Sequence, residues 1–445
     1  MSSAMLPDTH ALPSPPVPRG QLATDAEALR RYAERAERRL TLLPPRPERD
    51  AAQEAQADAL RDACRTARHS FLARHAEQVY EVLTEGRARR LRLNPLVREA
   101  QARFPGLVPA EARLAEDRDR VQAQKEGHEI DLGVFFGALL RCAVAGTHLM
   151  ETMLHTAPGS QALLEDFRRT DRLELNSVHV ERRGPAAHVT FRNSHCLNAE
   201  DNQLIADLES AVDVVLLDDR VRVGVLRGGG VDHPRYAGRR VFSAGINLKD
   251  LRNGAISYLD FLLGRELGYV NKLAHGLLPT ESGWRVPAAV HKPWVAAVDT
   301  FAIGGGMQLL LVVDRVIAED GAFFSLPAAD EGIVPGLGNL RLTRLTGARM
   351  ARQVLLSGRR LRAGEPGAEL VCDEVVPAGE LHDAVERAVA DLAGPAVAAN
   401  RAMLALAEEP WSHLRSYLAE FAVVQAQRIY SADVIARVES RWAGA

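Results

Sequence analysis

Cysteine is scarce in this chain. Four cysteines occur among 445 residues, and no two of them form a C-x-x-C pair. They stand at Cys64, Cys142, Cys196 and Cys372. Disulfide frameworks and cysteine-bound zinc sites need more closely grouped thiols, so neither is expected. This scarcity favours a reducing compartment, and we predict a cytoplasmic protein.

The sequence also lacks a long uninterrupted hydrophobic run. Its most apolar stretch, residues 130–154, is interrupted by Asp131, Arg141, His148 and Glu151. A membrane-spanning helix needs about 20 predominantly apolar residues, so we predict one buried helix here and no membrane insertion. No basic-then-apolar signal pattern is present at the N-terminus. The polar, proline-rich residues 1–22 are predicted to be disordered.

Further absences narrow the function. The net charge of −3 and the isoelectric point near 6.6 do not suggest a nucleic-acid partner. The chain contains no H-E-x-x-H motif, no G-x-S-x-G motif and no phosphate loop of the type G-x-x-x-x-G-K. Metal-dependent hydrolysis, serine hydrolysis and nucleotide hydrolysis therefore have no support, and no metal site is predicted.

The feature that organises the chain is a strand followed by three glycines. Residues 290–306 read V-H-K-P-W-V-A-A-V-D-T-F-A-I-G-G-G, and an apolar helical run follows over residues 307–313. We expect a buried strand at residues 294–298. Glycines at the start of a helix leave backbone N–H groups bare and let another atom approach closely. Such a place can hold a developing negative charge, although a tight turn gives the same pattern.

Two more segments match this one in character. Residues 241–250 read V-F-S-A-G-I-N-L-K-D after a predicted buried strand at residues 221–226, and residues 324–336 read F-S-L-P-A-A-D-E-G-I-V-P-G. In order and spacing, the three segments resemble the motifs F-[SC]-A-G-x-[DN]-L-[KR], A-[LI]-G-G-G and F-x-x-P-x-x-x-x-G-[IT]-x-P-G. These motifs are typical of the enoyl-CoA hydratase/isomerase, or crotonase, superfamily. The resemblance covers about residues 175–376.

This resemblance implies an α/β fold, a crotonase-like spiral of stacked ββα units. Before it, residues 24–131 are rich in Ala, Arg, Glu and Leu with helical periodicity, which predicts an all-helical N-terminal domain. Beyond residue 361 the chain is again mostly helical, and amphipathic helices are expected at residues 381–392 and 395–408. We predict four regions: a disordered N-terminus (1–22), a helical N-terminal domain (23–174), an acyl-CoA-binding core (175–376) and C-terminal helices that make oligomer contacts and cover the site (377–445).

The resemblance also implies how a thioester would be held. The backbone N–H groups of Ile246 and Gly305 would form an oxyanion hole for the enolate. The Ala244 carbonyl, with its neighbours Gly245 and Asn247, would contact the adenine of coenzyme A. An inserted loop at residues 228–240 borders the nucleotide groove in relatives. Its residues His233, Arg235, Tyr236 and Arg240 are candidates for CoA binding, with a solvated basic loop as the alternative.

Two departures from the motifs are informative. Hydratases place glutamates at the positions of Gln308 and Ala328 in this chain. Neither side chain here can exchange a proton near neutral pH, and adding water across a double bond needs a positioned acid and base. We therefore do not expect a hydratase, although the motif segments that bind the thioester are retained.

The glutamine, the helical extension and the apolar positions together resemble one group within the superfamily. Its members are cofactor-independent dioxygenases of vancomycin-type glycopeptide-antibiotic biosynthesis, which convert (3,5-dihydroxyphenyl)acetyl-CoA and O2 to the aryl glyoxylate and CoA for dihydroxyphenylglycine supply. The resemblance implies no metal and no cofactor, because the enolate itself reduces O2. It also implies a homo-oligomer, either a trimer or a dimer of trimers.

Within this hypothesis Glu200, Arg265 and Gln308 would bind the ring hydroxyls, with a charge on a surface helix as the alternative for Arg265. Leu248, Ile333 and Val434 would form a dry O2 pocket, with ordinary core packing as the alternative for each. The catalytic base stays open between Glu200 and a water molecule. Other acyl-CoA enolate chemistry, as in an isomerase or a thioesterase, is the main alternative function, and a catalytically silent acyl-CoA-binding protein is the other.

Overall fold

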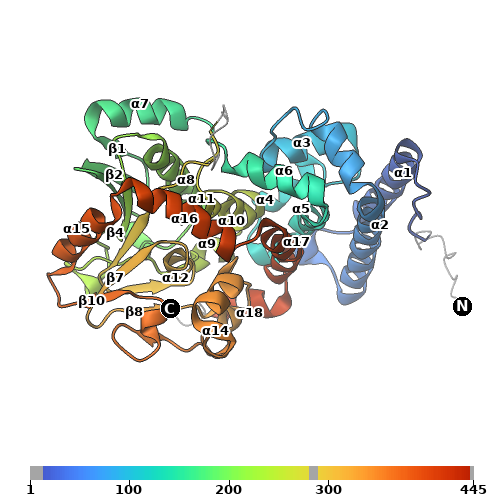
Figure 1. Cartoon of the computed structure of the whole chain (residues 1–445). Coiled ribbons are helices and arrows are strands. Elements are labelled where there is room, and N and C mark those ends of the chain that lie inside the picture. Colours follow the sequence, from blue (N-terminus) through green and yellow to red (C-terminus); the bar gives the residue numbers. More distant parts are fainter. Residues whose placement is uncertain (1–13, 280–288, 441–445) are drawn as a thin grey trace, which may run out of the picture.

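The computed structural model describes residues 14–279 and 289–440. A β-sheet with its covering helices occupies one side of the molecule, and the N-terminal helices occupy the other (Figure 1). The prediction of a disordered N-terminus over residues 1–22 lies, for residues 1–13, outside the described residues. The first helix begins at Leu22.

From residue 14, where the described part of the chain begins, seven α-helices precede the first strand. They are α1 (Leu22–Leu40), α2 (Ala51–Leu83), α3 (Leu93–Arg103), α4 (Glu111–Arg118), α5 (Glu129–Arg141), α6 (Ala143–Leu154) and α7 (Ser160–Thr170). The 33-residue helix α2 begins with a capping box, in which the side chains of Asp50 and Gln53 each accept a hydrogen bond from the other's backbone N–H. Proline-containing turns separate α1 from α2 and precede α4.

The apolar stretch at residues 130–154 is two helices and not the single buried helix that was predicted. Helices α5 and α6 meet at Cys142 and are bent by 107° relative to each other. Gly146 permits the bend, because an added Cβ there would lie 2.6 Å from the Leu140 carbonyl oxygen. Within the described ranges no single helix is long and apolar enough to cross a membrane, and this bent pair passes the length and composition test only when taken together.

Among the described residues, seven strands form the main sheet. They are β1 (Arg172–Glu174), β2 (Val178–Arg183), β3 (Ala186–Phe191), β4 (Val223–Gly228), β5 (Trp294–Val298), β7 (Arg315–Glu319) and β10 (Glu374–Val376), in this spatial order. Strands β1 to β3 are antiparallel, and β3 onward is parallel. A second, small sheet contains β6 (Phe301–Ile303), β8 (Phe323–Ser325) and β9 (Leu361–Arg362). The strand predicted at residues 294–298 is confirmed.

Helices alternate with these strands, as parallel pairing requires. The helices of the core are α8 (Asn202–Leu217), α9 (Leu248–Arg252), α10 (Gly264–Leu267), α11 (Tyr269–His275), α12 (Gly305–Leu310), α13 (Ala328–Glu331), α14 (Gly338–Ser357) and α15 (Leu381–Leu392), with a π-helical segment at Tyr258–Leu263. The chain ends in α16 (Pro395–Glu408), α17 (Trp411–Arg428) and α18 (Ala432–Ser440).

Helix α17 connects the two sides of the molecule. It lies between the N-terminal helices and the sheet (Figure 1) and packs along α5. Gly133 and Gly137 allow this close approach, because a Cβ at either position would lie within 3.0 Å of an α17 carbonyl oxygen. The Tyr258 hydroxyl donates to the Ala422 carbonyl at 2.8 Å. The C-terminal helices therefore share one buried core with the N-terminal helices and the sheet.

Candidate active site

Two glycine-containing segments meet backbone to backbone at the centre of the core. Gly245 and Gly304 have φ angles of 84° and 55°, a region that disfavours other residues. A Cβ on Gly304 would lie 3.2 Å from the Gly245 Cα, and a Cβ on Gly245 would lie 3.4 Å from the Gly305 nitrogen. The Ile303 N–H also donates to the Ser243 carbonyl at 2.9 Å. The predicted pair of motifs is thus in direct contact.

The two predicted oxyanion donors lie on either side of this contact. Gly305 is the first residue of α12, so its N–H has no acceptor within the helix. A Cβ on Gly304 would be 4.0 Å from the Ile246 nitrogen. Within the described part of the chain, neither the Ile246 N–H nor the Gly305 N–H donates a hydrogen bond. Two bare, preorganised amide donors are what an enolate oxygen requires.

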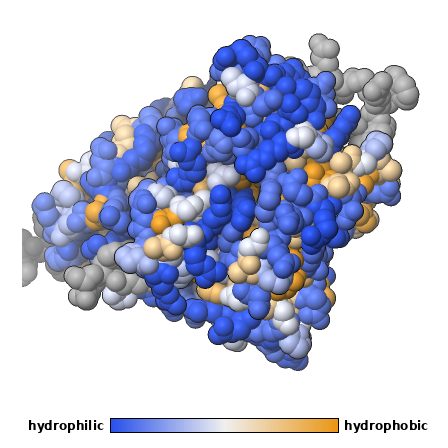
Figure 2. Space-filling model, turned by 90° about the vertical axis from the view of Figure 1, so that its left-hand side faces the viewer, coloured by the Kyte–Doolittle hydropathy of each residue, from blue (hydrophilic) through white to orange (hydrophobic). Residues whose placement is uncertain are grey.

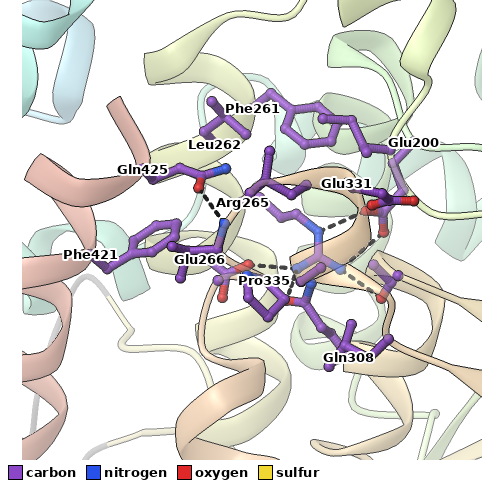
Figure 3. A pocket seen from close by; sticks show the side chains of 18 residues that line it. Glu200, Phe261, Leu262, Arg265, Glu266, Gln308, Glu331, Pro335, Phe421 and Gln425 are labelled. Atoms are coloured by element: carbon purple, nitrogen blue, oxygen red, sulfur yellow. Dashed lines mark hydrogen bonds and ion pairs between the residues drawn. The ribbon is translucent and has the colours of Figure 1, made fainter. Parts of the chain in front are cut away.

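Both donors face a small cavity. Its volume is about 40 Å³, and Ile246, Gly304 and Gly305 line it together with side chains from α10, α12, α13 and α17. The other lining residues are Glu200, Phe261, Leu262, Arg265, Glu266, Gln308, Leu326, Ala328, Glu331, Ile333, Val334, Pro335, Gly336, Phe421 and Gln425 (Figure 3). Most of these side chains are apolar, so the polar groups among them stand in a poorly solvated environment.

Arg265 is the hub of the polar groups. All five of its N–H groups are used: Nε and Nη2 bond Glu200 at 3.0 Å each, Nη1 bonds Glu266 at 2.6 Å and Gln308 at 3.2 Å, and Nη2 also bonds the Gly305 carbonyl at 2.9 Å. Figure 3 shows these bonds converging on the guanidinium. Burial opposes the charge of Arg265, but the carboxylates around it outweigh burial and raise its pKa well above the ordinary value.

Glu200 is fixed by both its backbone and its side chain. Its N–H donates to the Gly245 carbonyl at 2.6 Å, and its carbonyl accepts from the Asn247 N–H at 2.8 Å. Its carboxylate, on a residue only 2% exposed, also accepts from the Tyr269 hydroxyl at 3.2 Å. Burial raises the pKa of Tyr269, so this hydroxyl remains a donor. The backbone bonds tie Glu200 directly to the segment that carries Ile246.

The structure brings together most of the predicted site. Glu200, Arg265 and Gln308, which were expected to bind substrate, lie in one hydrogen-bonded cluster around the cavity, which we call the Arg265 cluster with Glu266 and Tyr269. Of the predicted O2-pocket residues, Ile333 lines this cavity. Leu248 and Val434 do not line it; Val434 packs at Gly332, where its Cγ2 would be 2.7 Å from an added Cβ.

The residues predicted to bind CoA lie in two places. Ala244, Gly245 and Asn247 adjoin Ile246, and the Asn247 side chain caps α9 by accepting from the N–H groups of residues 249 and 250. On the inserted loop His233, Arg235 and Tyr236 lie near one another. The ring centres of His233 and Tyr236 are 5.5 Å apart, and the Arg235 guanidinium lies 5.7 Å from the centre of the Tyr236 ring. Arg240 lines a different cavity, between the main sheet and α15.

Sequence reasoning missed several residues of this cavity. Glu266, Glu331, Phe421 and Gln425 all line it, and none was singled out as a site residue. Glu266 anchors the wall by accepting from the Leu337 N–H at 3.0 Å as well as from Arg265. Phe421 and Gln425 come from α17, far along the chain, and no local pattern marks them. The available signal was the charge of Glu266 and Glu331, each of which follows another charged residue, Arg265 or Asp330, in a mostly apolar segment.

A family model for enoyl-CoA hydratase/isomerase matches residues 181–427, more than half of the chain. The chain belongs to this family. Its fold also agrees with an enoyl-CoA hydratase structure from Mycobacterium avium subsp. paratuberculosis, at a TM-score of 0.50 and 23% identity over 60% of this chain and 99% of that one. The predicted crotonase fold, with N-terminal and C-terminal helices around it, is confirmed.

Two curated relatives, a dioxygenase and a probable hydratase, differ in how much of this chain they resemble. A (3,5-dihydroxyphenyl)acetyl-CoA 1,2-dioxygenase from Amycolatopsis orientalis is 52% identical over 420 residues, covering 94% of this chain and 96% of the relative. A probable enoyl-CoA hydratase from Rhizobium meliloti is 30% identical over 246 residues, covering 53% of this chain and 86% of the relative. The likeness to the dioxygenase thus extends through the N-terminal helices, whereas the likeness to the hydratase spans only about half of the chain.

Proposed function

We propose that this protein is a dioxygenase that converts (3,5-dihydroxyphenyl)acetyl-CoA and O2 to (3,5-dihydroxyphenyl)glyoxylate and CoA, in antibiotic biosynthesis. The observation that carries this proposal is a pocket with both oxyanion donors but without the hydratase glutamates, whose positions hold Gln308 and Ala328. The near full-length likeness to a dioxygenase supports the same reaction.

The reaction needs only groups that the chain and the substrates supply. Loss of a benzylic proton gives a thioester enolate, whose oxygen accepts from the Ile246 and Gly305 N–H groups. The enolate passes one electron to O2, and the radical pair combines to a peroxide on the benzylic carbon. The peroxide attacks the thioester carbonyl and expels the CoA thiolate. Cleavage of the O–O bond with loss of the second benzylic proton gives the keto acid.

The Arg265 cluster provides the polar partners for the two ring hydroxyls. A buried hydroxyl needs a hydrogen-bond partner, and Glu200 and Gln308 present acceptor and donor atoms at the cavity wall. Arg265 has no unused N–H, and its bond to Gln308, at 3.2 Å, is the longest of the five. We infer that a ring hydroxyl replaces this bond, so that Arg265 and Gln308 each contact the substrate.

Substrate binding also requires the cavity to enlarge. A cavity of about 150 Å³ accommodates benzene, whereas this one measures about 40 Å³. One wall is formed by residues 333–336 and by Phe421 and Gln425 of α17, and the Gln425 side chain accepts from the Val334 N–H at 2.9 Å. We propose that this wall moves outward for the ring. Ile333 is proposed to form the apolar side that holds O2, and Leu248 and Val434, which do not line the cavity as it stands, would join it only if the enlarged cavity reaches them.

Coenzyme A would extend from this pocket past Ala244, Gly245 and Asn247 toward the inserted loop. There His233, Arg235, Tyr236 and Arg240 are proposed to contact its nucleotide, since Arg suits phosphate. Apolar side chains on α16 support assembly into a trimer or a dimer of trimers: Met403, Leu404 and Leu406 are 64%, 57% and 54% exposed. Such patches interrupt the mostly hydrophilic surface seen in Figure 2. The unpaired state of all four cysteines fits the proposed cytoplasmic location.

The decisive experiment measures O2 uptake by chelator-treated protein given (3,5-dihydroxyphenyl)acetyl-CoA, with thiol release followed in the same sample. Equal amounts of O2 consumed and CoA released are expected. Thiol release that continues unchanged under nitrogen would indicate a thioesterase instead. Tight binding without turnover would indicate a silent acyl-CoA-binding protein.

A further inference from the structure

Glu331 is one of three carboxylates that line the cavity; the other two, Glu200 and Glu266, are both bound to Arg265. Arginine does not deprotonate in proteins, so within the described lining these carboxylates are the groups able to take a proton. Glu200 and Glu266 are only 2% and 3% exposed. Loss of the charge on either would remove one of the two carboxylates that balance the buried Arg265, which is costly.

Glu331 differs from these two in its position. It is the last residue of α13, three residues after Ala328, and both side chains line the cavity (Figure 3 labels Glu331). Residues three apart on a helix share one face. Ala328 stands where hydratases carry a proton-transfer glutamate, so this chain places a carboxylate one helical turn further along the same face. Glu331 is also only half-buried, so a proton on it can reach water.

Helix α13 is held firmly enough to aim this carboxylate. The Arg428 Nε donates to the Gly332 carbonyl at 2.6 Å, and the Arg437 Nη1 donates to the Asp330 carbonyl at 2.5 Å. These arginines belong to α17 and α18, so the C-terminal helices fix the C-terminal end of α13. A short helix with only 4 residues would otherwise fray.

From this geometry we propose that Glu331 is the catalytic base that removes the first benzylic proton. The C–H bond breaks, its electron pair moves into the enolate held by Ile246 and Gly305, and the proton moves to the Glu331 carboxylate. Glu331 later returns this proton to the CoA thiolate when the C–S bond breaks, so the base is regenerated. This assignment rests on the proposed function, because it concerns a substrate with an acidic benzylic C–H next to a thioester.

The test measures proton exchange at the benzylic carbon in the absence of O2. Substrate carrying deuterium at the benzylic carbon is incubated anaerobically with enzyme in ordinary water, and loss of deuterium is measured by mass spectrometry. Wild-type protein is expected to wash out the label. In E331Q the exchange rate falls by about 10² to 10⁴, the usual contribution of a general base, while the Kd for substrate stays the same. E331D, with a shorter side chain, keeps part of the rate.

The matched control is D330N, which removes the neighbouring exposed carboxylate that does not line the cavity. It is expected to exchange at the wild-type rate. Wild-type exchange in E331Q, or equal losses in E331Q and D330N, would overturn the assignment. If E331Q folds poorly, E331A with added acetate decides the question, because a small carboxylate restores exchange only where a base is missing. Label washout by a wild-type enzyme that consumes no O2 would refute the dioxygenase and leave the base assignment to the variants.

Discussion

Two buried charge clusters in this protein are built in opposite ways. The Arg265 cluster has a cation at its centre and carboxylates around it, and it borders a cavity. The second cluster, here called the Glu409 cluster, has a carboxylate at its centre: Glu409 accepts from His275 at 2.8 Å, from Arg341 at 2.9 Å and from Arg344 at 2.8 Å. Its residues do not line the cavity of the candidate site.

The two clusters are proposed to serve different purposes: the Glu409 cluster a structural one and the Arg265 cluster a catalytic one. Glu409 stands between α16 and α17 and binds them to α11 and α14, so its contacts hold the C-terminal helices in place. Arg265 also joins distant elements, but its partners include the Gly305 carbonyl and two side chains proposed to touch substrate. Loss of the Glu409 cluster should therefore lower stability alone, whereas loss of the Arg265 cluster should lower stability and turnover together.

The largest effect is expected for Arg265→Met. This change leaves Glu200 and Glu266 buried without their shared cation, which costs about 3–5 kcal/mol of unfolding free energy. Turnover should fall more than a hundredfold, because the wall that carries Gly305 and Gln308 loses its brace. Urea unfolding and O2 uptake measure the two losses. Arg265→Lys is the control for charge alone and should still fail, since lysine cannot supply five N–H groups. Full activity in either variant would show that the Arg265 cluster is not needed for turnover.

Glu409→Gln should separate stability from activity. The variant leaves His275 and Arg341 without a buried counter-charge, and we expect a loss of about 3–5 kcal/mol in unfolding free energy. Well below the melting temperature kcat should stay close to the wild-type value. Thermal unfolding and steady-state kinetics provide the two readouts. A fall in kcat as large as that of Arg265→Met would show that the Glu409 cluster also shapes the site.

Acid should weaken the Glu409 cluster in a defined range. Burial opposes the charge of Glu409, but Arg341 and His275 outweigh it and hold its pKa well below the ordinary 4.5. A depressed carboxylate pKa stabilises the fold fully above the unfolded-state value, and this stabilisation is lost as pH falls below it. The gap in unfolding free energy between wild type and Glu409→Gln should therefore shrink below about pH 4.5. A gap that stays constant down to pH 3 would contradict this prediction.

The smallest expected effect is that of Tyr269→Phe. It removes one neutral donor to Glu200, a bond of 3.2 Å, and leaves both bonds from Arg265 intact. We expect a loss of about 0.5–1.5 kcal/mol in unfolding free energy and a change in kcat of less than tenfold. Chemical denaturation and O2 uptake test this. A larger loss of activity would mean that the tyrosine hydroxyl itself reaches the substrate.

The elements that sequence reasoning predicted well are those with strong local signals. The strand at Trp294–Val298 and the helices at Leu381–Leu392 and Pro395–Glu408 match the structure in full, because apolar runs and proline or glycine boundaries define them locally. The single helix predicted over residues 130–154 was wrong. Its break at Cys142 depends on how Gly146 meets Leu140, a contact that hydrophobic periodicity does not record.

The candidate site also contains residues that local motifs predicted and residues that only the structure identified. Ile246, Gly305 and Gln308 belong to motifs, and the structure places all three on one cavity. Glu266 and Glu331 could not be identified as site residues from the sequence, because the cavity that they line is formed with residues far away in the chain. Arg265 was predicted as a substrate contact, but the saturation of its five N–H groups could not be foreseen without its partners. The predicted domain limits and the roles of the CoA-loop residues stay predictions.

The proposed oxyanion donors are backbone groups, and this limits how they can be tested. Both are main-chain amides, at Ile246 and Gly305, positioned by the contact between Gly245 and Gly304. Alanine scanning cannot delete a backbone N–H, and at Gly305 a methyl group would strike the Glu200 carboxylate at 1.9 Å, so the substitution would report a collision instead. The two N–H groups proposed to stabilise the enolate therefore cannot be tested by side-chain mutagenesis. Replacing a single amide by an ester through chemical ligation would remove one donor and leave every side chain in place.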